Sequence, residues 1–169
     1  MAGATVFQLE TSPIAEEDLM TEAHVYDTPF YNSVADYVCE VEDRDAAELY
    51  LADLLSFVNK DHELVTITRN DDGRIATVTF RDGFREAFFA PGYVTFMKLL
   101  AELTVVTTPA AFTDGKIEMQ LFMLRSAYDD EFSDYVFTNE CEFITLDEFI
   151  RTVKIDTPYH LGGIMGYHF

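Results

Sequence analysis

The stretch ELVTITRNDDGRIATVTF, residues 63–80, decides the class of fold. It contains two runs rich in β-branched residues, separated by Asp72-Gly73, a dipeptide typical of tight hairpin turns. The stretch therefore predicts a β-hairpin, and further strands make a mostly antiparallel sheet the expected core. The other segments that alternate in the manner of strands are 4–8, 36–42 and 139–144.

Apolar residues recur at helical spacing in two longer segments, residues 44–58 and about 93–104. Shorter helices are expected after Ser12-Pro13 and after Thr145, which begins a Thr-x-x-Glu capping-box pattern. The sequence therefore predicts a single α+β domain of 169 residues without an internal linker, in which the sheet packs with two longer helices and several shorter ones.

Three further segments carry weaker signals. FREAFF, residues 84–89, predicts a third short strand after the hairpin, and KIEMQLFML, residues 116–124, is ambiguous between strand and helix. Its length and the turn before it favour a strand. The C-terminal segment TPYHLGGIMGYHF, residues 157–169, is apolar, so we expect it to pack against the body, with its glycines as packing positions. A phosphate-binding loop needs a helix directly behind it, and too few residues follow.

The composition indicates a globular core. Hydrophobic residues make up 49% of the chain, with fifteen Phe. Cys39 and Cys141 are far apart and both fall in predicted strands, so we expect reduced structural thiols. Apolar runs fall short of a membrane span and no leader pattern is present. We expect a soluble protein of the cytoplasm of a bacterial or archaeal host.

The net charge of −20, from 31 acids and 11 bases, is the most unusual property of the sequence. Direct association with nucleic acid or an anionic membrane is not expected, because phosphate binding requires Lys and Arg. A basic protein or ribonucleoprotein is the expected partner. The charges are unevenly spread: residues 1–58 hold thirteen acids and one base, residues 59–126 nine acids and eight bases, and residues 127–169 nine acids and two bases.

The segment CEVEDRDAAE, residues 39–48, lies at the centre of the first acidic region. Alternation over residues 36–42 predicts an outward face for every second residue, and Asp43 or Asp45 is expected to cap the helix that follows. Tyr37, Cys39 and Val41 are expected to point inward, and the side chains expected to point outward are Asp36, Val38, Glu40, Glu42, Asp43, Asp45, Glu48 and Asp53.

Motifs for chemistry are missing from the sequence. The acidic stretches lack the glycine of a calcium loop, the histidines His24, His62, His160 and His168 form no zinc pattern, and no Gly-x-Ser-x-Gly is present. With 31 acids, a suitably spaced carboxylate pair carries no information about catalysis. We therefore expect no catalytic residue, no metal and no cofactor.

The spacing of the acids suggests a different use. Residues i and i+2 of a strand lie about 6.7 Å apart on one face, and residues three or four apart on a helix rise by about 4.5–6 Å. These spacings resemble those of successive phosphates on a nucleic-acid strand. The pairs that meet the condition are Glu40 with Glu42, Glu140 with Glu142, Asp45 with Glu48 and, if helical, Asp130 with Asp134.

These observations lead to a DNA-mimic hypothesis, in which a carboxylate surface occupies the basic groove of a nucleic-acid-binding defence complex. In size and charge the chain resembles the small acidic inhibitors that phages and mobile elements use against restriction or CRISPR nucleases; the resemblance is one of composition only. The alternatives are an immunity protein or antitoxin for a basic nuclease toxin, a small enzyme with a cationic substrate, and a halophilic or structural module. The expected partner-binding residues are Glu40, Glu42, Asp43, Asp45, Glu48, Asp53, Asp129, Asp130, Glu131, Asp134, Glu140 and Glu142.

Overall fold

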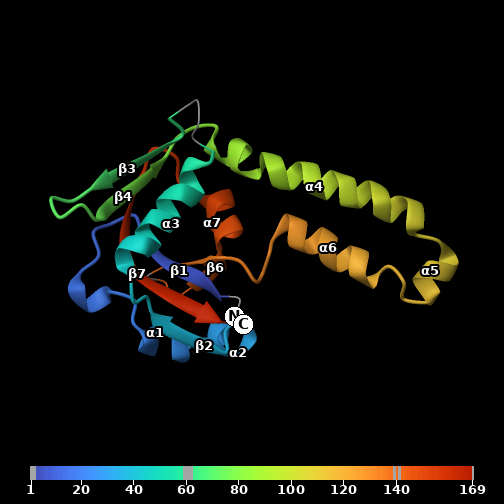
Figure 1. The fold of residues 1–169 in the computed structure, drawn as a ribbon, viewed down its shortest axis with the longest axis horizontal. Helices are drawn as coiled ribbons and strands as arrows, with labels where there is room; N and C mark the ends of the chain where they lie inside the picture. Colours follow the sequence, from blue (N-terminus) through green and yellow to red (C-terminus); the bar gives the residue numbers. More distant parts are fainter. Residues whose placement is uncertain (1–2, 59–62, 139, 141, 169) are drawn as a thin grey trace.

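The computed structural model describes residues 3–58, 63–138, 140 and 142–168. Its strands form one sheet in the order β3-β4-β7-β1-β5-β6, with β2 also paired to β7 (Figure 1). β1 and β5 are parallel, and the other pairs are antiparallel. The α+β prediction is confirmed. The strands are β1 (Gly3–Glu10), β2 (Tyr37–Glu40), β3 (Val65–Arg69), β4 (Ile75–Phe80), β5 (Tyr135–Thr138), β6 (Glu142–Thr145) and β7 (Pro158–His168).

Helices cover both faces of the sheet. Ile164 and Met165 are neighbours on β7 and point to opposite faces, each into its own cluster of buried side chains. One cluster lies under α3, α7 and the first turn of α4, and the other lies under α1 and α2. The helices are η1 (Glu16–Asp18), α1 (Glu22–Tyr26), α2 (Pro29–Ser33), α3 (Arg44–Ser56), α4 (Phe84–Val106), α5 (Pro109–Thr113), α6 (Glu118–Tyr128) and α7 (Leu146–Thr152).

The C-terminal strand β7 lies in the middle of the sheet. One of its edges pairs with β1, while the other pairs with β4 near Tyr159 and with β2 near Tyr167. The expectation that the tail packs against the body is confirmed. β7 therefore joins β2 and β4 to the rest of the sheet.

A β-bulge in β7 explains two of its glycines. Between Phe7 and Leu9 the pairing with β1 shifts by one residue, so that Gly162 and Gly163 both lie opposite Gln8. Gln8 is fully buried, and its amide oxygen accepts hydrogen bonds from the backbone N–H groups of Gly163 (3.0 Å) and Met20 (2.8 Å). The glycines are packing positions, as expected.

Local signals predicted several elements correctly. The hairpin is present as β3 and β4, and Gly73 occupies the left-handed region at φ 85°. The helix predicted over 44–58 is α3, and Asp43 caps it by accepting a hydrogen bond from the Ala46 N–H (2.9 Å). Thr145 caps α7 by accepting from the Glu148 N–H (3.1 Å).

Two of the predicted strands are helices. Residues 84–89 form the first turns of α4, and residues 118–124 belong to α6, so the predicted helix 93–104 is only part of a longer one. Leu, Met, Gln and Glu dominate residues 118–124, and their intrinsic preference for helix prevails where no neighbouring strand offers a ladder. The helix predicted after Pro13 is reduced to the single turn η1.

The bulge generates a stability prediction. A Cβ at Gly163 would lie 2.8 Å from the Met20 carbonyl oxygen, whereas one at Gly166 would meet nothing closer than the Cys39 Sγ at 3.9 Å. We expect Gly163→Ala to lower the free energy of unfolding by about 1–3 kcal/mol. The matched variant Gly166→Ala, on the same strand, is expected to change it by less than about 0.5 kcal/mol. Urea denaturation measures both, and equal losses would contradict this explanation.

Candidate interaction surfaces

The chain divides into an acidic body and a neutral arm. The arm, residues 84–128, comprises α4, α5 and α6 and extends away from the sheet (Figure 1). It holds four acids and four bases, whereas the other 124 residues, the body, hold 27 acids and seven bases. The whole net charge of −20 therefore belongs to the body, which is the surface expected to attract a basic partner.

Glu48 is not part of that surface. Its side chain is 2% exposed, and its carboxylate accepts hydrogen bonds from the Arg44 Nε (2.9 Å) and from the backbone N–H of Ile75 (2.6 Å). The expectation that Glu48 points outward was wrong, because the start of β4 needs an acceptor at this position of α3. Arg44 also donates to the Gly162 carbonyl (2.9 Å), so the one base of residues 1–58 is engaged within the fold.

Four predicted acids remain exposed where β2 leads into α3. We call Glu40, Glu42, Asp43 and Asp45 the corner group. Glu22 of α1 lies beside it, because its carboxylate accepts a hydrogen bond from the Glu40 N–H (3.3 Å). β2 ends at Glu40, and two of its residues lie opposite to the prediction: Val38 is buried and Tyr37 is 58% exposed. Val38 packs beneath α1 and α2. No local sequence pattern predicts that these two helices cover this face of β2.

A second set of acids surrounds the loop between α6 and β5. We call Asp129, Asp130, Glu131, Asp147 and Glu148 the loop group. Asp129 accepts a hydrogen bond from the Thr145 hydroxyl (2.7 Å), which ties the loop to α7. Four of these acids lie close enough to Tyr135 to affect its hydroxyl. Burial, the largest cause, and the negative charges of Asp129, Glu131, Asp130 and Glu148 together raise the pKa of the Tyr135 hydroxyl to about 12. Two of these carboxylates have basic neighbours: Glu131 pairs with Arg125 (2.9 Å), and Asp129 lies 4.0 Å from the Arg151 guanidinium. The loop group is therefore close together but partly neutralised.

Asp134, predicted as a partner-binding residue, is buried beneath this loop. Its Oδ1 accepts from the Thr5 N–H (2.9 Å) and its Oδ2 from the Tyr50 hydroxyl (2.6 Å), which links the loop to β1 and α3. Burial raises the pKa of the Asp134 carboxyl above its usual range, against the opposing effect of these two hydrogen bonds. Asp134 is therefore a structural residue.

The regular carboxylate spacing predicted from the sequence is not formed. Glu42 lies beyond the end of β2, Glu140 lies in a turn before β6, and the segment around Asp130 is a turn instead of a helix. Asp45 and Glu48 do not form a surface pair either, because Glu48 is buried. Moreover β7, β1 and β5 lie between β2 and β6, so Glu40 and Glu142 are separated by about 19 Å across four strand spacings. Asp53 is exposed on α3, apart from both groups.

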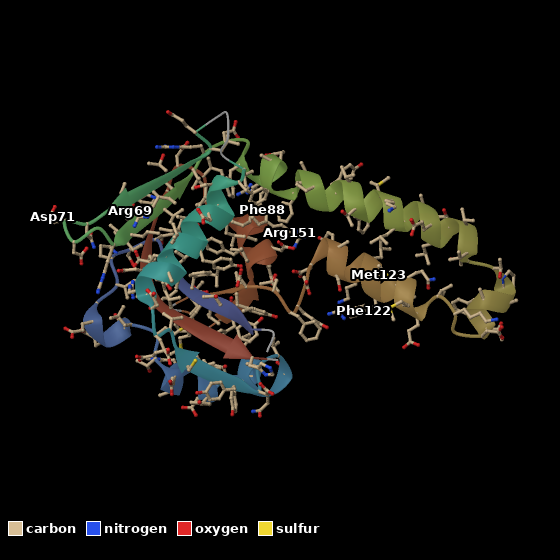
Figure 2. The ribbon with its side chains drawn as sticks, in the orientation of Figure 1. Arg69, Asp71, Phe88, Phe122, Met123 and Arg151 are labelled. Atoms are coloured by element: carbon tan, nitrogen blue, oxygen red, sulfur yellow. The ribbon has the colours of Figure 1, made fainter. Side chains whose placement is uncertain are left out.

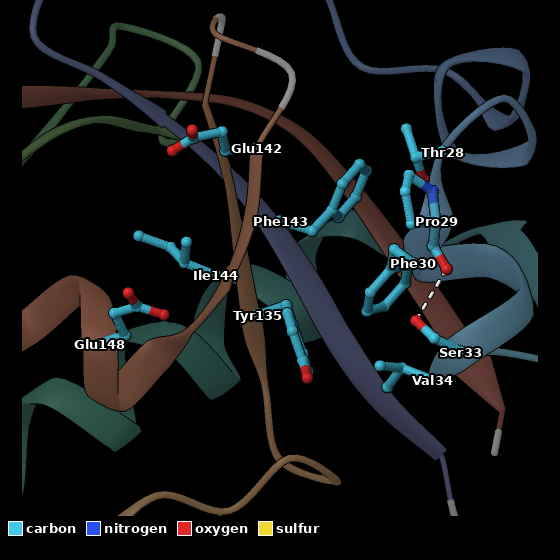
Figure 3. A pocket seen from close by; sticks show the side chains of 10 residues that line it. All are labelled: Thr28, Pro29, Phe30, Ser33, Val34, Tyr135, Glu142, Phe143, Ile144 and Glu148. Carbon is cyan, nitrogen blue, oxygen red and sulfur yellow. Dashed lines mark hydrogen bonds between the residues drawn. The ribbon is translucent and has the colours of Figure 1, made fainter.

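Glu142 instead borders a groove between α2 and β6. The groove has a volume of about 500 Å³. Glu142 and Glu148 lie at its rim, and its floor is aromatic: the Phe30 ring stacks on Phe143 (4.7 Å between centroids) and meets Tyr135 edge-on (4.8 Å) (Figure 3). β6 ends the order of strands on this side of the sheet. Phe143 packs on the α2 face of β6, whereas Glu142, like Ile144, points to the other face, so the carboxylates and the rings border the groove from opposite sides (Figure 3). The carboxylates suit ion pairs with Lys or Arg side chains, and the rings suit cation–π contact.

The arm is the surface that sequence reasoning missed. α4 is 23 residues long, and by length and apolar composition it qualifies as a membrane span, which corrects the expectation from the sequence. Its apolar window is unburied, and α6 exposes Phe122 and Met123, labelled in Figure 2. Arg151 joins the arm to the body: its guanidinium lies over the rings of Phe89 (4.7 Å) and Tyr128 (4.2 Å).

Among the described residues, no group of three or more His, Cys, Asp and Glu side chains is arranged to hold a metal ion. His24 accepts a hydrogen bond from the Thr21 N–H (3.0 Å), and the His168 Nδ1 lies 2.8 Å from the Asp36 carboxylate. The predictions for His62 and Cys141 fall outside the described residues. Comparisons with protein-family models, with curated proteins and with solved structures found no match.

The buried carboxylate of Glu48 leads to a first prediction for this region. Glu48→Ala leaves the Ile75 N–H without its acceptor, so we expect it to lower the free energy of unfolding by at least about 2 kcal/mol. Asp53→Ala, an exposed acid on the same helix, is the matched control and should change it by less than about 0.5 kcal/mol. Comparable values in chemical denaturation would show that Glu48 has no structural role.

Asp134 makes stability depend on pH. Because its folded-state pKa is raised, its contribution is most favourable at acidic pH and is lost as pH rises through that pKa. The free-energy advantage of the wild type over Asp134→Asn should therefore shrink between about pH 3 and about pH 7. Tyr50→Phe removes a hydrogen bond that lowers this pKa, so it should steepen the loss. Denaturation at a series of pH values measures both, and an advantage that grows with pH would contradict the assignment.

Proposed function

We propose that this protein is an acidic inhibitor whose body binds the basic, nucleic-acid-binding surface of a defence complex of the restriction or CRISPR type. The observation that carries the proposal is the segregation of charge: the body holds 27 acids against seven bases, while the arm is neutral. A Lys- and Arg-lined groove that normally contacts phosphates would be occupied by carboxylates, and nucleic acid would be excluded.

The arrangement of acids defines how such binding would work. The corner group and the loop group present negative charge on separate parts of the body, without the regular spacing of a phosphate backbone. Charge density would therefore provide most of the attraction, and affinity would fall as salt rises. The groove beside β6 adds a more specific contact, because Glu142 and Glu148 border it on one side and the rings of Phe30 and Phe143 on the other. Arg or Lys side chains of the partner would form ion pairs with the carboxylates and cation–π contacts with the rings.

The groove also favours a second candidate, an immunity protein that neutralises a basic nuclease toxin. Such a protein uses a small interface in which a few residues carry most of the binding energy. The groove has that character, since two carboxylates and an aromatic floor are confined to about 500 Å³. The two candidates differ in how binding energy is distributed: over many weak carboxylates for the inhibitor, and within the groove for the immunity protein.

Displacement of a fluorescent DNA duplex from a purified restriction or CRISPR effector complex tests the proposal. We expect the wild-type chain to displace the duplex at about 50 mM salt and to do so much less well at about 200 mM. Replacing the corner group with Glu40→Gln, Glu42→Gln, Asp43→Asn and Asp45→Asn should weaken displacement by about tenfold. Asn at position 43 still caps α3, so the fold is retained.

Two further variants separate the candidates. If the protein is the proposed inhibitor, Glu142→Gln with Glu148→Gln should weaken binding only partly, and this effect should add to that of the corner variant. If the protein is an immunity protein, the same double variant should abolish binding to the toxin without any change in the corner group. Glu86→Gln with Glu118→Gln makes the same change of charge on the arm and should have little effect. Failure of the wild type to displace duplex from any tested effector at low salt would contradict the proposal.

A further inference from the structure

The arm exposes an apolar stripe along the side of α4 that faces away from α6. Residues 94, 98, 101 and 105 follow one face of the helix, with 97 and 102 beside them, and all six are exposed. Val94 is 68% and Val105 80% exposed. On the opposite side of α4, residues 96, 99 and 103 are partly covered. A two-helix hairpin buries only its inner faces, so this stripe has no cover within the body.

We propose that two copies of this chain associate through their arms, with the α4 stripes packed antiparallel against each other and the two α6 helices on the outside of the pair. A two-fold axis passing near Leu100 makes the stripe self-complementary. It sets Val94 close to Val105 of the other copy, and Lys98 of each copy opposite Glu102 of the other. The two charges of the stripe thus become partners across the interface.

Charge separation favours a second copy as the occupant. Two bodies of −20 repel each other, but the arm is neutral and offers a surface on which two copies meet without that repulsion. Sixteen residues separate Phe84 from Leu100, or about 24 Å of helix, so the axis sets the bases of the two arms about 48 Å apart. That is several times the Debye length of about 8 Å at physiological ionic strength.

A hollow near the tip of the arm lies beside the stripe, on the flank of α4 that turns toward α6. It has a volume of about 480 Å³ and is lined by Ala101, Glu102, Val105, Val106 and Gln120. Within the described part of the chain, the buried Oε1 of Gln120 has no hydrogen-bond partner.

A lipid bilayer is the alternative cover, and the arm suits it poorly. α6 has eleven residues and spans about 16 Å, roughly half of the hydrocarbon thickness. Lys98 and Glu102 lie within the apolar stretch of α4, where both charges would enter the hydrocarbon core. In the paired arms, the same two residues form ion pairs at the edge of an apolar interface.

Sedimentation equilibrium of the full chain at about 150 mM salt tests the inference. We expect a mass of twice the 19.3 kDa of the monomer. Val94→Asp with Val105→Asp should raise the dimer dissociation constant at least about tenfold, because it introduces charge into the apolar interface. Both side chains are exposed in the monomer, so its fold is retained. Leu49→Asp, at an exposed apolar residue of the body, is the matched control and should leave the mass unchanged.

A charge exchange gives a second readout. Lys98→Glu and Glu102→Lys should each weaken the dimer, and the double variant should restore it, because each residue faces the other in the second copy. The corner-group variant should dimerise like the wild type, which makes this result independent of the proposed function. A monomeric wild type overturns the inference, whether or not it floats with phosphatidylcholine vesicles. A dimer that persists in the Val94 and Val105 variant also overturns it.

Discussion

The position of β7 in the middle of the sheet is the constraint on which the rest of the structure depends. β1, β2 and β4 all pair with it, and both core clusters receive side chains from it. Such a strand must approach its neighbours closely, and the bulge at Gly162 and Gly163 achieves this with the buried amide of Gln8. The glycine-rich C-terminal segment is thus the centre of the domain.

The acidity of the body follows from its composition, 27 acids against seven bases, and three of its arginines have partners within the fold. Arg44 is bound to Glu48 and to the Gly162 carbonyl, and Arg81 pairs with Asp156 at 2.8 Å. Arg151 is held against Phe89 and Tyr128 at the base of the arm. Arg44 and Arg151 thus contact other parts of the fold, whereas Arg81 and Asp156 form an exposed pair. Each ion pair neutralises one acid together with one base, so the excess of acids remains, and the corner group stays exposed to solvent.

Sequence reasoning succeeded where a signal was local. The Asp72-Gly73 turn and the Thr145 cap each depend on a few adjacent residues, and both were predicted correctly. It failed where the decisive partner is remote in sequence: Glu48 accepts from Ile75, and Asp134 from Thr5 and Tyr50. The Arg44 and Glu48 pair, four residues apart, was a usable sign of an internal contact. For Asp134 no such sign exists.

The arm shows a different limit of sequence reasoning. Length and the preceding turn favoured a strand for residues 116–124, whereas residues 118–124 belong to α6 on an exposed hairpin. Hydrophobicity predicts that a surface will be covered, but it does not say whether the cover belongs to the same chain. The arm and the body consequently present two surfaces of opposite physical character, one apolar and neutral, the other polar and strongly negative.

The most direct test of this account is a salt series on one preparation, from about 50 to about 500 mM NaCl, followed by sedimentation velocity with a fluorescein-labelled peptide rich in arginine and lysine. We predict that the peptide dissociates from the acidic body as salt rises, while the chain remains a dimer because its interface is mainly apolar and added salt screens the repulsion between bodies. Peptide binding that is insensitive to salt, or a dimer that dissociates together with the peptide, would contradict the account.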